Sequence, residues 1–232
     1  MKKNILIVFV IFGFIACESE KPNLIIEGQI KGLKKGKLYL QKFVDTTVVN
    51  LDSVTLYSTN QFRFEQKLDY PQVMYLELQK DTIDPTENFI SFFADKGQLK
   101  IEAKLDRFIF AEIEGNYPNQ QEFKTYSKTM KRFGDQKLDL IKAEMEARRD
   151  NNSKTLDSVN IAYNTMNKRR SLFAVNFAKS HPDLEVAPYV VLNQSKYIRK
   201  SYLDTIYQTF DRKVQKSHYG KKLKELITKE DF

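Results

Sequence analysis

The spacing of hydrophobic positions changes about halfway along the chain. From residue 23 to about residue 115, short apolar or alternating runs are separated by turn residues, as in Phe62-Arg63-Phe64-Glu65. A period of two places one face of a strand in a core and the other face in water. From residue 118 onward, apolar side chains recur at intervals of three, four and seven, the spacing of amphipathic helices. The pattern therefore predicts strands followed by helices, an α+β fold class.

Eight short strands are predicted in the first half. They cover residues 24–30, 37–44, 48–56, 62–68, 73–78, 89–93, 99–103 and 108–113. Gly32, Gly36, Pro71 and the run 95–98 supply turns between them. We expect the first two strands to form one hairpin, and the third and fourth to form another. Many short strands with frequent turns are typical of a β-sandwich or an open barrel, and an antiparallel β-sandwich is predicted for residues 23–116.

Two long amphipathic helices are predicted to open a helical domain over residues 117–232. The apolar positions of the first are Phe123, Tyr126, Met130, Phe133, Leu138, Ile141 and Met145, and those of the second are Leu156, Val159, Tyr163, Met166, Phe173 and Phe177. A turn at residues 150–153 separates them, with Asn152 or Ser153 as the N-cap. The helices should form a long antiparallel hairpin that ends at His181-Pro182. Shorter helices are expected at residues 188–194, 202–214 and 217–228.

The N-terminus has the pattern of an export signal. Lys2 and Lys3 precede an uncharged apolar run of twelve residues, from Ile5 to Ala16. As a helix this run would cover about 18 Å, which is short for a hydrocarbon core about 30 Å thick. A signal peptide is therefore a better interpretation than a membrane span.

The residues after the apolar run indicate what kind of signal this is. Ala16 stands directly before Cys17, the only cysteine of the chain, and polar residues follow at once. This resembles the lipobox of bacterial lipoproteins, in which the cysteine thiol takes a diacylglycerol and the new amino group is then acylated. Phe14 replaces the usual Leu, a departure from the motif. The resemblance implies that residues 1–16 are a signal peptide, that Cys17 is the lipidation site and that residues 17–22 are a lipidated tether.

Composition excludes several kinds of function. A chain with one cysteine cannot form an internal disulfide or a Cys-x-x-Cys site, and two histidines cannot make a His-rich metal centre. The net charge of +8 is spread along the sequence, and its densest basic cluster, Lys168-Arg169-Arg170, is short. Nucleic-acid binding needs a concentrated basic face, so no nucleic-acid partner is expected.

Several short runs in the first half resemble domain of unknown function 4369, an N-terminal β-domain of many Bacteroidetes envelope lipoproteins. They are Ile26-Glu27-Gly28-Gln29-Ile30, Gly36-Lys37-Leu38-Tyr39-Leu40, Leu51-Asp52-Ser53-Val54 and Phe62-Arg63-Phe64. Asn60-Gln61 replace the glycine and lysine that usually precede the aromatic pair. His181-Pro182 and the run 217–223 are similar to the helical segment that follows in those proteins. In many relatives a thioredoxin-like domain comes next, but its redox activity is not carried over, because this sequence lacks the cysteine pair.

Other groups of residues suggest chemistry less strongly. Asp81, Asp84 and Glu87 could bind calcium, but their run lacks the glycine and the ligand alternation of calcium loops, so a solvated acidic loop is expected. His181 and His218 stand near helix ends and favour capping or surface roles. Glu112 and Glu114 would lie side by side on one strand, without the opposed geometry of a glycosidase.

The aromatic positions of the two long helices allow two interpretations. Phe123, Tyr126, Phe133, Tyr163, Phe173 and Phe177 are expected to form the seam between the helices, with a ligand groove as the alternative. No catalytic residue, cofactor or metal is predicted.

The sequence leads to a functional hypothesis of a non-enzymatic lipoprotein. It predicts a cell-envelope protein held by its lipid, expected at the outer membrane on the periplasmic or surface face, with a binding role and a protein partner in the envelope. An accessory role beside a separate thioredoxin-like protein, and capture of glycans or nutrients at the surface, are the alternatives.

Overall fold

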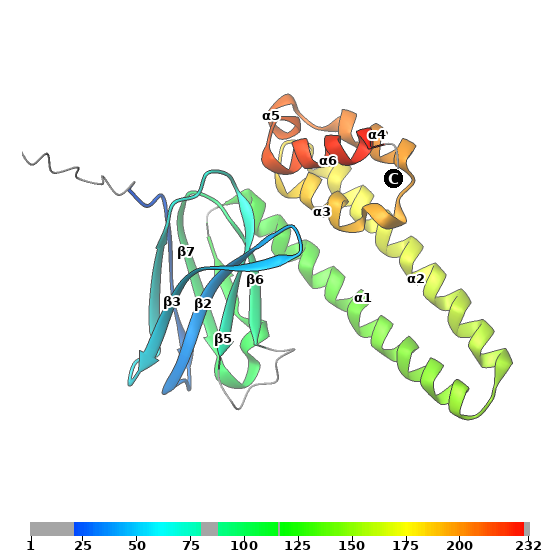
Figure 1. Cartoon of the computed structure of the whole chain (residues 1–232), viewed down its shortest axis with the longest axis horizontal. Coiled ribbons are helices and arrows are strands. Elements are labelled where there is room, and N and C mark those ends of the chain that lie inside the picture. Colours follow the sequence, from blue (N-terminus) through cyan, green and yellow to red (C-terminus); the bar gives the residue numbers. More distant parts are fainter. Residues whose placement is uncertain (1–20, 80–87, 116, 230–232) are drawn as a thin grey trace, which may run out of the picture.

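The first half of the chain folds into two four-stranded sheets that face each other (Figure 1). The computed structural model describes residues 21–79, 88–115 and 117–229. The strands are β1 (Leu24–Lys31), β2 (Lys35–Val44), β3 (Thr47–Tyr57), β4 (Gln61–Gln66), β5 (Gln72–Gln79), β6 (Phe89–Ala94), β7 (Gly97–Lys104) and β8 (Glu112–Glu114). The first sheet has the order β4-β1-β7-β8 and the second β3-β2-β5-β6. The predicted fold class, a β-sandwich followed by a helical domain, is confirmed.

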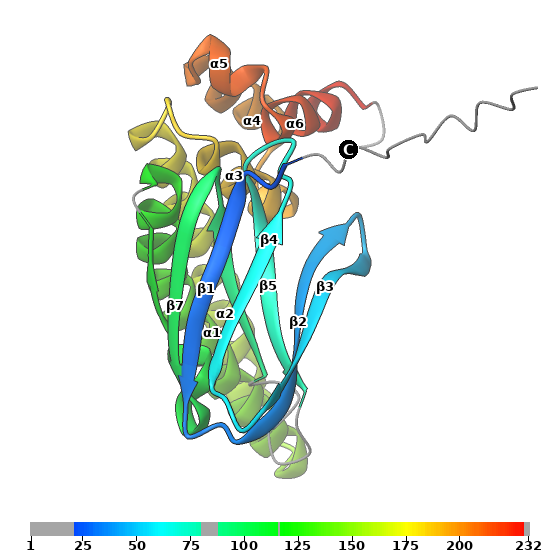
Figure 2. The same ribbon diagram turned by 90° about the vertical axis from the view of Figure 1, so that its left-hand side faces the viewer.

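The pairing of strands differs from the predicted hairpins. β1 and β2 lie in different sheets, and so do β3 and β4. β1 pairs antiparallel with β4 and parallel with β7, from Leu24 opposite Gly97 to Lys31 opposite Lys104 (Figure 2). The other strand pairs are antiparallel. Alternation along a strand indicates which side chains are buried but carries no information about the hydrogen-bonding partner, which is why both hairpin predictions were wrong.

The last predicted strand is mostly a short helix. Residues Leu105–Phe110 form a 3₁₀ helix, and only Glu112–Glu114 pair with β7 as β8. The segment is kinked at Arg107, whose backbone is not helical. Phe108 is buried in the sandwich core and Leu105 packs against that core. This helix therefore covers one end of the sandwich where a strand had been expected.

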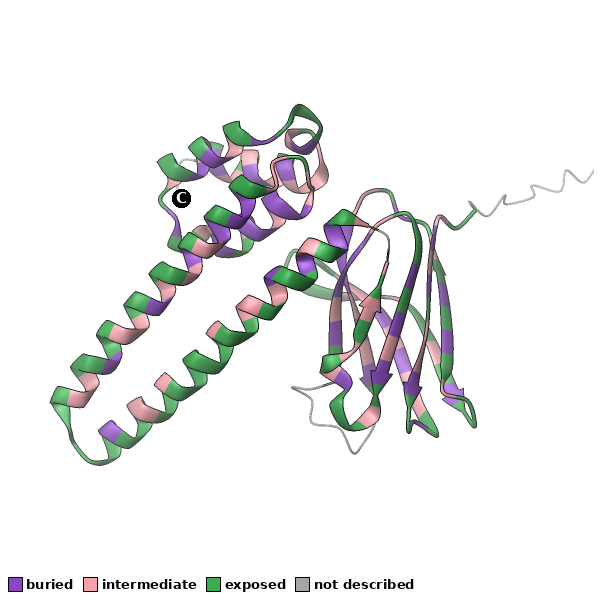
Figure 3. Cartoon of the chain, turned by 180° about the vertical axis from the view of Figure 1, so that it is seen from behind, coloured by how far each residue is buried: buried purple, intermediate pink, exposed green. Residues whose placement is uncertain are grey.

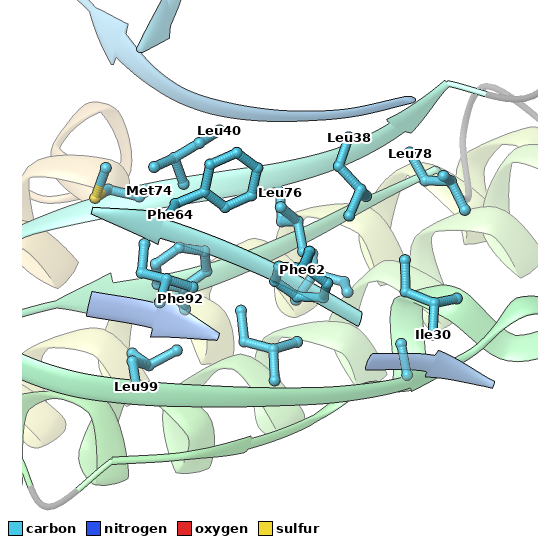
Figure 4. Close-up of a cluster of buried hydrophobic side chains, with 14 of the residues drawn as sticks. Ile30, Leu38, Leu40, Phe62, Phe64, Met74, Leu76, Leu78, Phe92 and Leu99 are labelled. Carbon is cyan, nitrogen blue, oxygen red and sulfur yellow. The ribbon is translucent and has the colours of Figure 1, made fainter. Parts of the chain in front are cut away.

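The sandwich core is built from side chains that alternate inward on both sheets. Those on the second sheet include Leu38, Leu40, Leu76 and Leu78, and those on the first include Phe62, Phe64 and Leu99, all almost fully buried (Figure 4). Burying one such side chain is worth about 1.5–3 kcal/mol. These contacts hold the two sheets together and fix which side chains of the second sheet point outward.

The helical half begins with the predicted antiparallel hairpin. Its helices are α1 (Pro118–Arg149) and α2 (Ser153–Ser180), followed by α3 (Val186–Gln194), α4 (Lys200–Thr209), α5 (Arg212–Gln215) and α6 (His218–Thr228). Asn152 is the N-cap of α2, because its side-chain oxygen accepts a hydrogen bond from the Thr155 amide at 3.0 Å. α2 ends at His181, as predicted. Among the described residues, no helix combines the length and apolar character needed to cross a membrane.

Part of the predicted helix seam is exposed instead. Leu138, Ile141 and Met145 of α1 have exposed fractions of 65%, 37% and 67%. Ala147 of α1 is buried at this end, facing α2 across the seam. The regular spacing correctly placed the three larger residues on one face, but periodicity does not show whether another element covers that face.

An aromatic cluster joins the second sheet to the helices. The Phe93 ring lies 6.0 Å from Phe123 of α1, 6.1 Å from Tyr189 of α3 and 6.1 Å from Tyr219 of α6, measured between ring centroids. The Phe93 amide donates a hydrogen bond of 2.7 Å to the side-chain oxygen of Gln120. We call this cluster the sheet–helix joint, because it sets the position of the helices against the outer face of the sheet.

Candidate binding groove

A groove lies on the outer face of the second sheet, beside the sheet–helix joint. One hollow of about 460 Å³ is lined by Gln41, Phe43, Val48, Tyr75, Glu77, Asn88 and Phe89. A second hollow of about 350 Å³ shares Phe43 and Tyr75 and extends to the helices, where Tyr189, Leu192, Asn193, Tyr219 and Lys222 line it together with Asp45 and Val73. The two hollows together are called the aromatic groove.

The groove follows from the alternation of side chains on two neighbouring strands. On β2 and β5 the leucines point into the sandwich, so Gln41, Phe43, Tyr75 and Glu77 point outward. The Tyr75 ring lies 5.0 Å from Phe43 and 6.3 Å from Phe89, edge to face in both contacts. Phe43 and Phe89 keep exposed fractions of 51% and 46%. The groove therefore presents aromatic surface to solvent on a rigid sheet.

A network of amide groups holds a carboxylate at the centre of the first hollow. The Gln41 amide donates to Glu77 at 2.6 Å and to the Asn50 side-chain oxygen at 2.9 Å. The Asn88 amide donates to the other Glu77 carboxylate oxygen at 3.0 Å. A carboxylate can accept about four hydrogen bonds. Glu77 is thus fixed in place and can still accept hydrogen bonds from a ligand.

Three tyrosines line the end of the groove that lies against the helices. Burial raises the pKa of Tyr75, Tyr189 and Tyr219, so their hydroxyl groups stay neutral at physiological pH. The Tyr219 hydroxyl oxygen accepts a hydrogen bond from the Val73 amide at 3.1 Å. The three tyrosines therefore add neutral hydroxyl groups to the aromatic lining of the groove.

His218 does not line the groove but packs against Tyr219, which does. Its ring stacks on Tyr70 with 3.8 Å between centroids, and it also contacts Tyr219 edge to face. Burial, and then the nearby Lys222 ammonium, lower the pKa of His218 below its usual value. The predicted surface or capping role is thus replaced by ring packing at the start of α6.

The groove offers contacts typical of binding. Its lining combines aromatic and apolar side chains with a few polar groups, among them Gln41, Glu77 and Asn193. Apolar walls with a few fixed polar groups are the usual composition of small-molecule sites. Across the described part of the chain, no cluster of three or more His, Cys, Asp or Glu side chains could hold a metal ion.

Some residues singled out from the sequence lie outside the described residues. These are the lipidation candidate Cys17 and the acidic loop of Asp81, Asp84 and Glu87. Their predicted roles stay predictions.

The other singled-out residues lie apart from the groove. His181 caps the end of α2, where its Nδ1 is 2.8 Å from the Phe177 carbonyl oxygen and its Nε2 is 3.1 Å from the Glu122 carboxylate. Glu112 and Glu114 lie opposite Glu102 and Lys100 on exposed strand positions. The structure therefore does not bring these residues together into one site.

The aromatic residues of the long helices form a seam. Tyr126 stacks on Phe173 at 5.8 Å and contacts Phe177 at 5.3 Å, while Phe133 lies 6.5 Å from Phe173. Burial raises the pKa of Tyr126 to about 12. The seam interpretation therefore holds for these four rings, whereas Phe123 packs against Phe93 and Tyr189 in the sheet–helix joint.

The groove residues were not predicted from the sequence. They come from strands that are far apart in the chain, and the hairpin predictions paired those strands wrongly. One feature of the sequence could have indicated the groove. Phe43 and Tyr75 stand at outward positions of their strands, where a solvated sheet face usually has polar residues.

Residues 24–123 match the family model described as Domain of unknown function (DUF4369). The match spans the whole sandwich and the first residues of α1, so the resemblance of this part of the chain to the family is confirmed. The rest of the helical half lies outside the match. Comparison with curated proteins and with solved structures gave no match.

Proposed function

We propose that this chain, whose sandwich matches the model of domain of unknown function 4369, is a lipid-anchored cell-envelope protein with a binding role and no catalytic activity. The observation that carries the binding role is the aromatic groove, with two exposed rings and a fixed carboxylate on the outer face of a sheet. A rigid, preformed surface of this kind lowers the cost of ordering side chains when a ligand binds. An enzymatic activity of the purified chain that depends on groove residues would contradict this proposal.

The proposed address depends on Cys17. Two or three acyl chains, each contributing about 0.8 kcal/mol per buried methylene, would hold the protein at a membrane effectively permanently. We place it at the outer membrane, on the periplasmic or the surface face, where a protein partner in the envelope could reach it. An accessory role beside a separate thioredoxin-like protein is the alternative, and co-purification of such a protein would favour it.

The lipid anchor can be tested with Cys17→Ser. A serine oxygen is a much weaker nucleophile than a thiolate, so the variant should incorporate no labelled fatty acid and should be lost from the carbonate-washed membrane fraction. Ser19→Ala is the matched control and should be labelled and retained like the unmodified chain. Retention of both label and membrane association by Cys17→Ser would show that this cysteine is not the anchor.

A second candidate function, capture of glycans, is favoured by the chemistry of the groove. Sugar rings have an apolar face that packs on aromatic rings and hydroxyl groups that donate to carboxylate and amide oxygens. Glu77, tied to two amides, disfavours anionic ligands and suits an uncharged ligand rich in hydroxyl groups. The groove composition therefore supports an uncharged oligosaccharide as the ligand class.

This candidate is tested with an array of uncharged oligosaccharides, followed by calorimetry on each hit. Phe43→Ala and Glu77→Gln should each weaken binding about tenfold, which corresponds to 1.4 kcal/mol. Phe110→Ala removes a phenylalanine that is 54% exposed but lies away from the groove, and it should leave the affinity unchanged. An array without hits, or hits that bind the two groove variants normally, would exclude glycan capture by this groove.

A further inference from the structure

The end of the β2–β3 hairpin is a two-stranded ribbon that leaves the second sheet. β2 pairs with β3 as far as Val44 opposite Thr47, but its pairing with β5 ends at Gln41. Figure 2 shows this end of the hairpin bending away from β5. The last residues of β2 therefore have one neighbouring strand where the middle of β2 has two. We call residues 42–49 the β2–β3 arm.

A β-bulge lies where the arm leaves the sheet. Leu40 pairs with Asp52, and Gln41 pairs with Asn50. Leu51 is therefore an extra residue on β3. A bulge bends its strand and interrupts the ladder of hydrogen bonds. Leu51 packs against the sandwich core, which fixes the base of the arm, so the bulge is the point about which the arm can bend.

Weak contacts attach the arm to the rest of the molecule. The sandwich strands carry buried positions along their length (Figure 3), whereas none of the described residues 42–49 is buried. The Phe43 ring contacts Tyr75, and at the tip Asp45 Oδ1 lies 3.8 Å from Lys222 Nζ of α6. The side chains of this ion pair are 87% and 43% exposed, so water screens their attraction. Because an isolated two-stranded hairpin is only marginally stable, little free energy separates the attached arm from a detached one.

The arm forms one wall of the aromatic groove. Phe43 and Val48 lie opposite each other on the arm and line the first hollow, and Phe43 and Asp45 line the second. The floor of the groove, with Tyr75 and Glu77, belongs to β5, which has β2 and β6 as neighbours. A displacement of the arm would therefore change the width of the groove while its floor stays fixed.

We propose that the β2–β3 arm is a flap that opens and closes the aromatic groove. It bends at the bulge of Leu51, and the structure has the closed arrangement, in which Asp45 and Lys222 meet beside the second hollow. A ligand in the groove gains contacts with Phe43 and Val48 only in this arrangement, so binding shifts the population toward it. The inference rests on the proposed function, because it takes the groove as the binding site and assigns the element that controls entry to it.

Amide hydrogen exchange of the full chain in mild detergent measures the opening of the arm. β4 is the internal reference, because it also lies at the edge of its sheet. The protected amides of residues 42–49 should exchange at least about tenfold faster than those of residues 61–66, since the arm opens while the sandwich stays folded. Equal exchange in the two segments would overturn the proposal.

Release of the tip should open the groove further. Lys222→Ala removes the ion pair with Asp45 and should make exchange in the arm about two- to fivefold faster. Hydroxyl-radical footprinting of this variant should show faster oxidation of Tyr75, while Tyr57, 70% exposed at the end of β3, is the unchanged reference. Lys221→Ala removes the neighbouring ammonium but keeps the ion pair, and it should change neither readout. Equal responses of the two lysine variants would contradict the closed arrangement of the flap.

These measurements use the chain without a ligand, so glycan capture can fail without affecting them. An oligosaccharide identified on the array should slow exchange in residues 42–49 at least about tenfold and leave residues 61–66 unchanged. A bound oligosaccharide that leaves exchange in the arm unchanged would overturn the flap but not the binding role. An array without hits would exclude glycan capture, and the exchange and footprinting results would still decide whether the arm opens.

Discussion

Phe93→Ala is expected to lower the free energy of unfolding by about 3–5 kcal/mol, the largest loss foreseen for any single truncation in this chain. The Phe93 side chain is completely buried and contacts rings from α1, α3 and α6. Removing it leaves a cavity at the one place where the sheet and three helices meet. Urea unfolding followed by circular dichroism measures the loss.

The same experiment needs an exposed phenylalanine as its control. Phe110 of the 3₁₀ helix is 54% exposed and contacts the Lys131 ammonium over its ring face, 3.3 Å from the centroid. Its replacement by alanine should change stability by about 0.5–1 kcal/mol at most. A loss below about 1 kcal/mol for Phe93→Ala would mean that the sheet–helix joint contributes little, and the helices would then be held in place by other contacts.

Gly28→Ala is expected to destabilise the sandwich by about 3 kcal/mol, the upper part of the range for overpacked cores. Gly28 lies on β1, between β4 and β7, where a Cβ atom would overlap the backbone carbonyl group of Ile101 and stand 2.9 Å from the Phe62 ring. Because a backbone carbonyl held in a sheet cannot turn aside, β7 itself would have to move. Thermal unfolding of the variant compared with the unmodified chain measures this effect.

A second glycine provides the opposite expectation. Gly134 lies inside α1, and a Cβ atom placed there would meet nothing within 4 Å. Gly134→Ala should therefore stabilise the chain by up to about 1 kcal/mol, since glycine is a poor helix former. If both substitutions changed the stability equally, the need for glycine at position 28 would come from backbone conformational preference and not from the close approach of β7.

The sequence was sufficient to predict the fold class and most element boundaries. Apolar spacing identified the helical hairpin, and the amide side chain of Asn152 marked the start of its second helix. These features depend on residues close together in the chain, whose physical preferences act locally.

Features that depend on distant residues were not predictable in the same way. The parallel pairing of β1 with β7 leaves no mark in the alternation of either strand, and the turn residues between β1 and β2 are equally compatible with a hairpin and with a crossing to the other sheet. For the aromatic groove, Phe43 and Tyr75 meet only because β2 pairs with β5. The exposure of Leu138 depends on the absence of a third element over that face in the described chain, which a helical period cannot show.

The position of β1 inside its sheet bears on when this protein can fold. Its neighbour β7 ends at Lys104. The two central strands of the first sheet therefore cannot pair until the chain up to that residue is available. Pairings between distant segments form slowly, because the entropy of closing a long loop is lost before the strand contacts that stabilise it can form. A chain that emerges from its N-terminus can form the local β2–β3 hairpin first, but it cannot complete the first sheet until β7 is available. For the export proposed above, this order would be useful, because the first sheet stays unformed while the proposed signal peptide engages the export machinery.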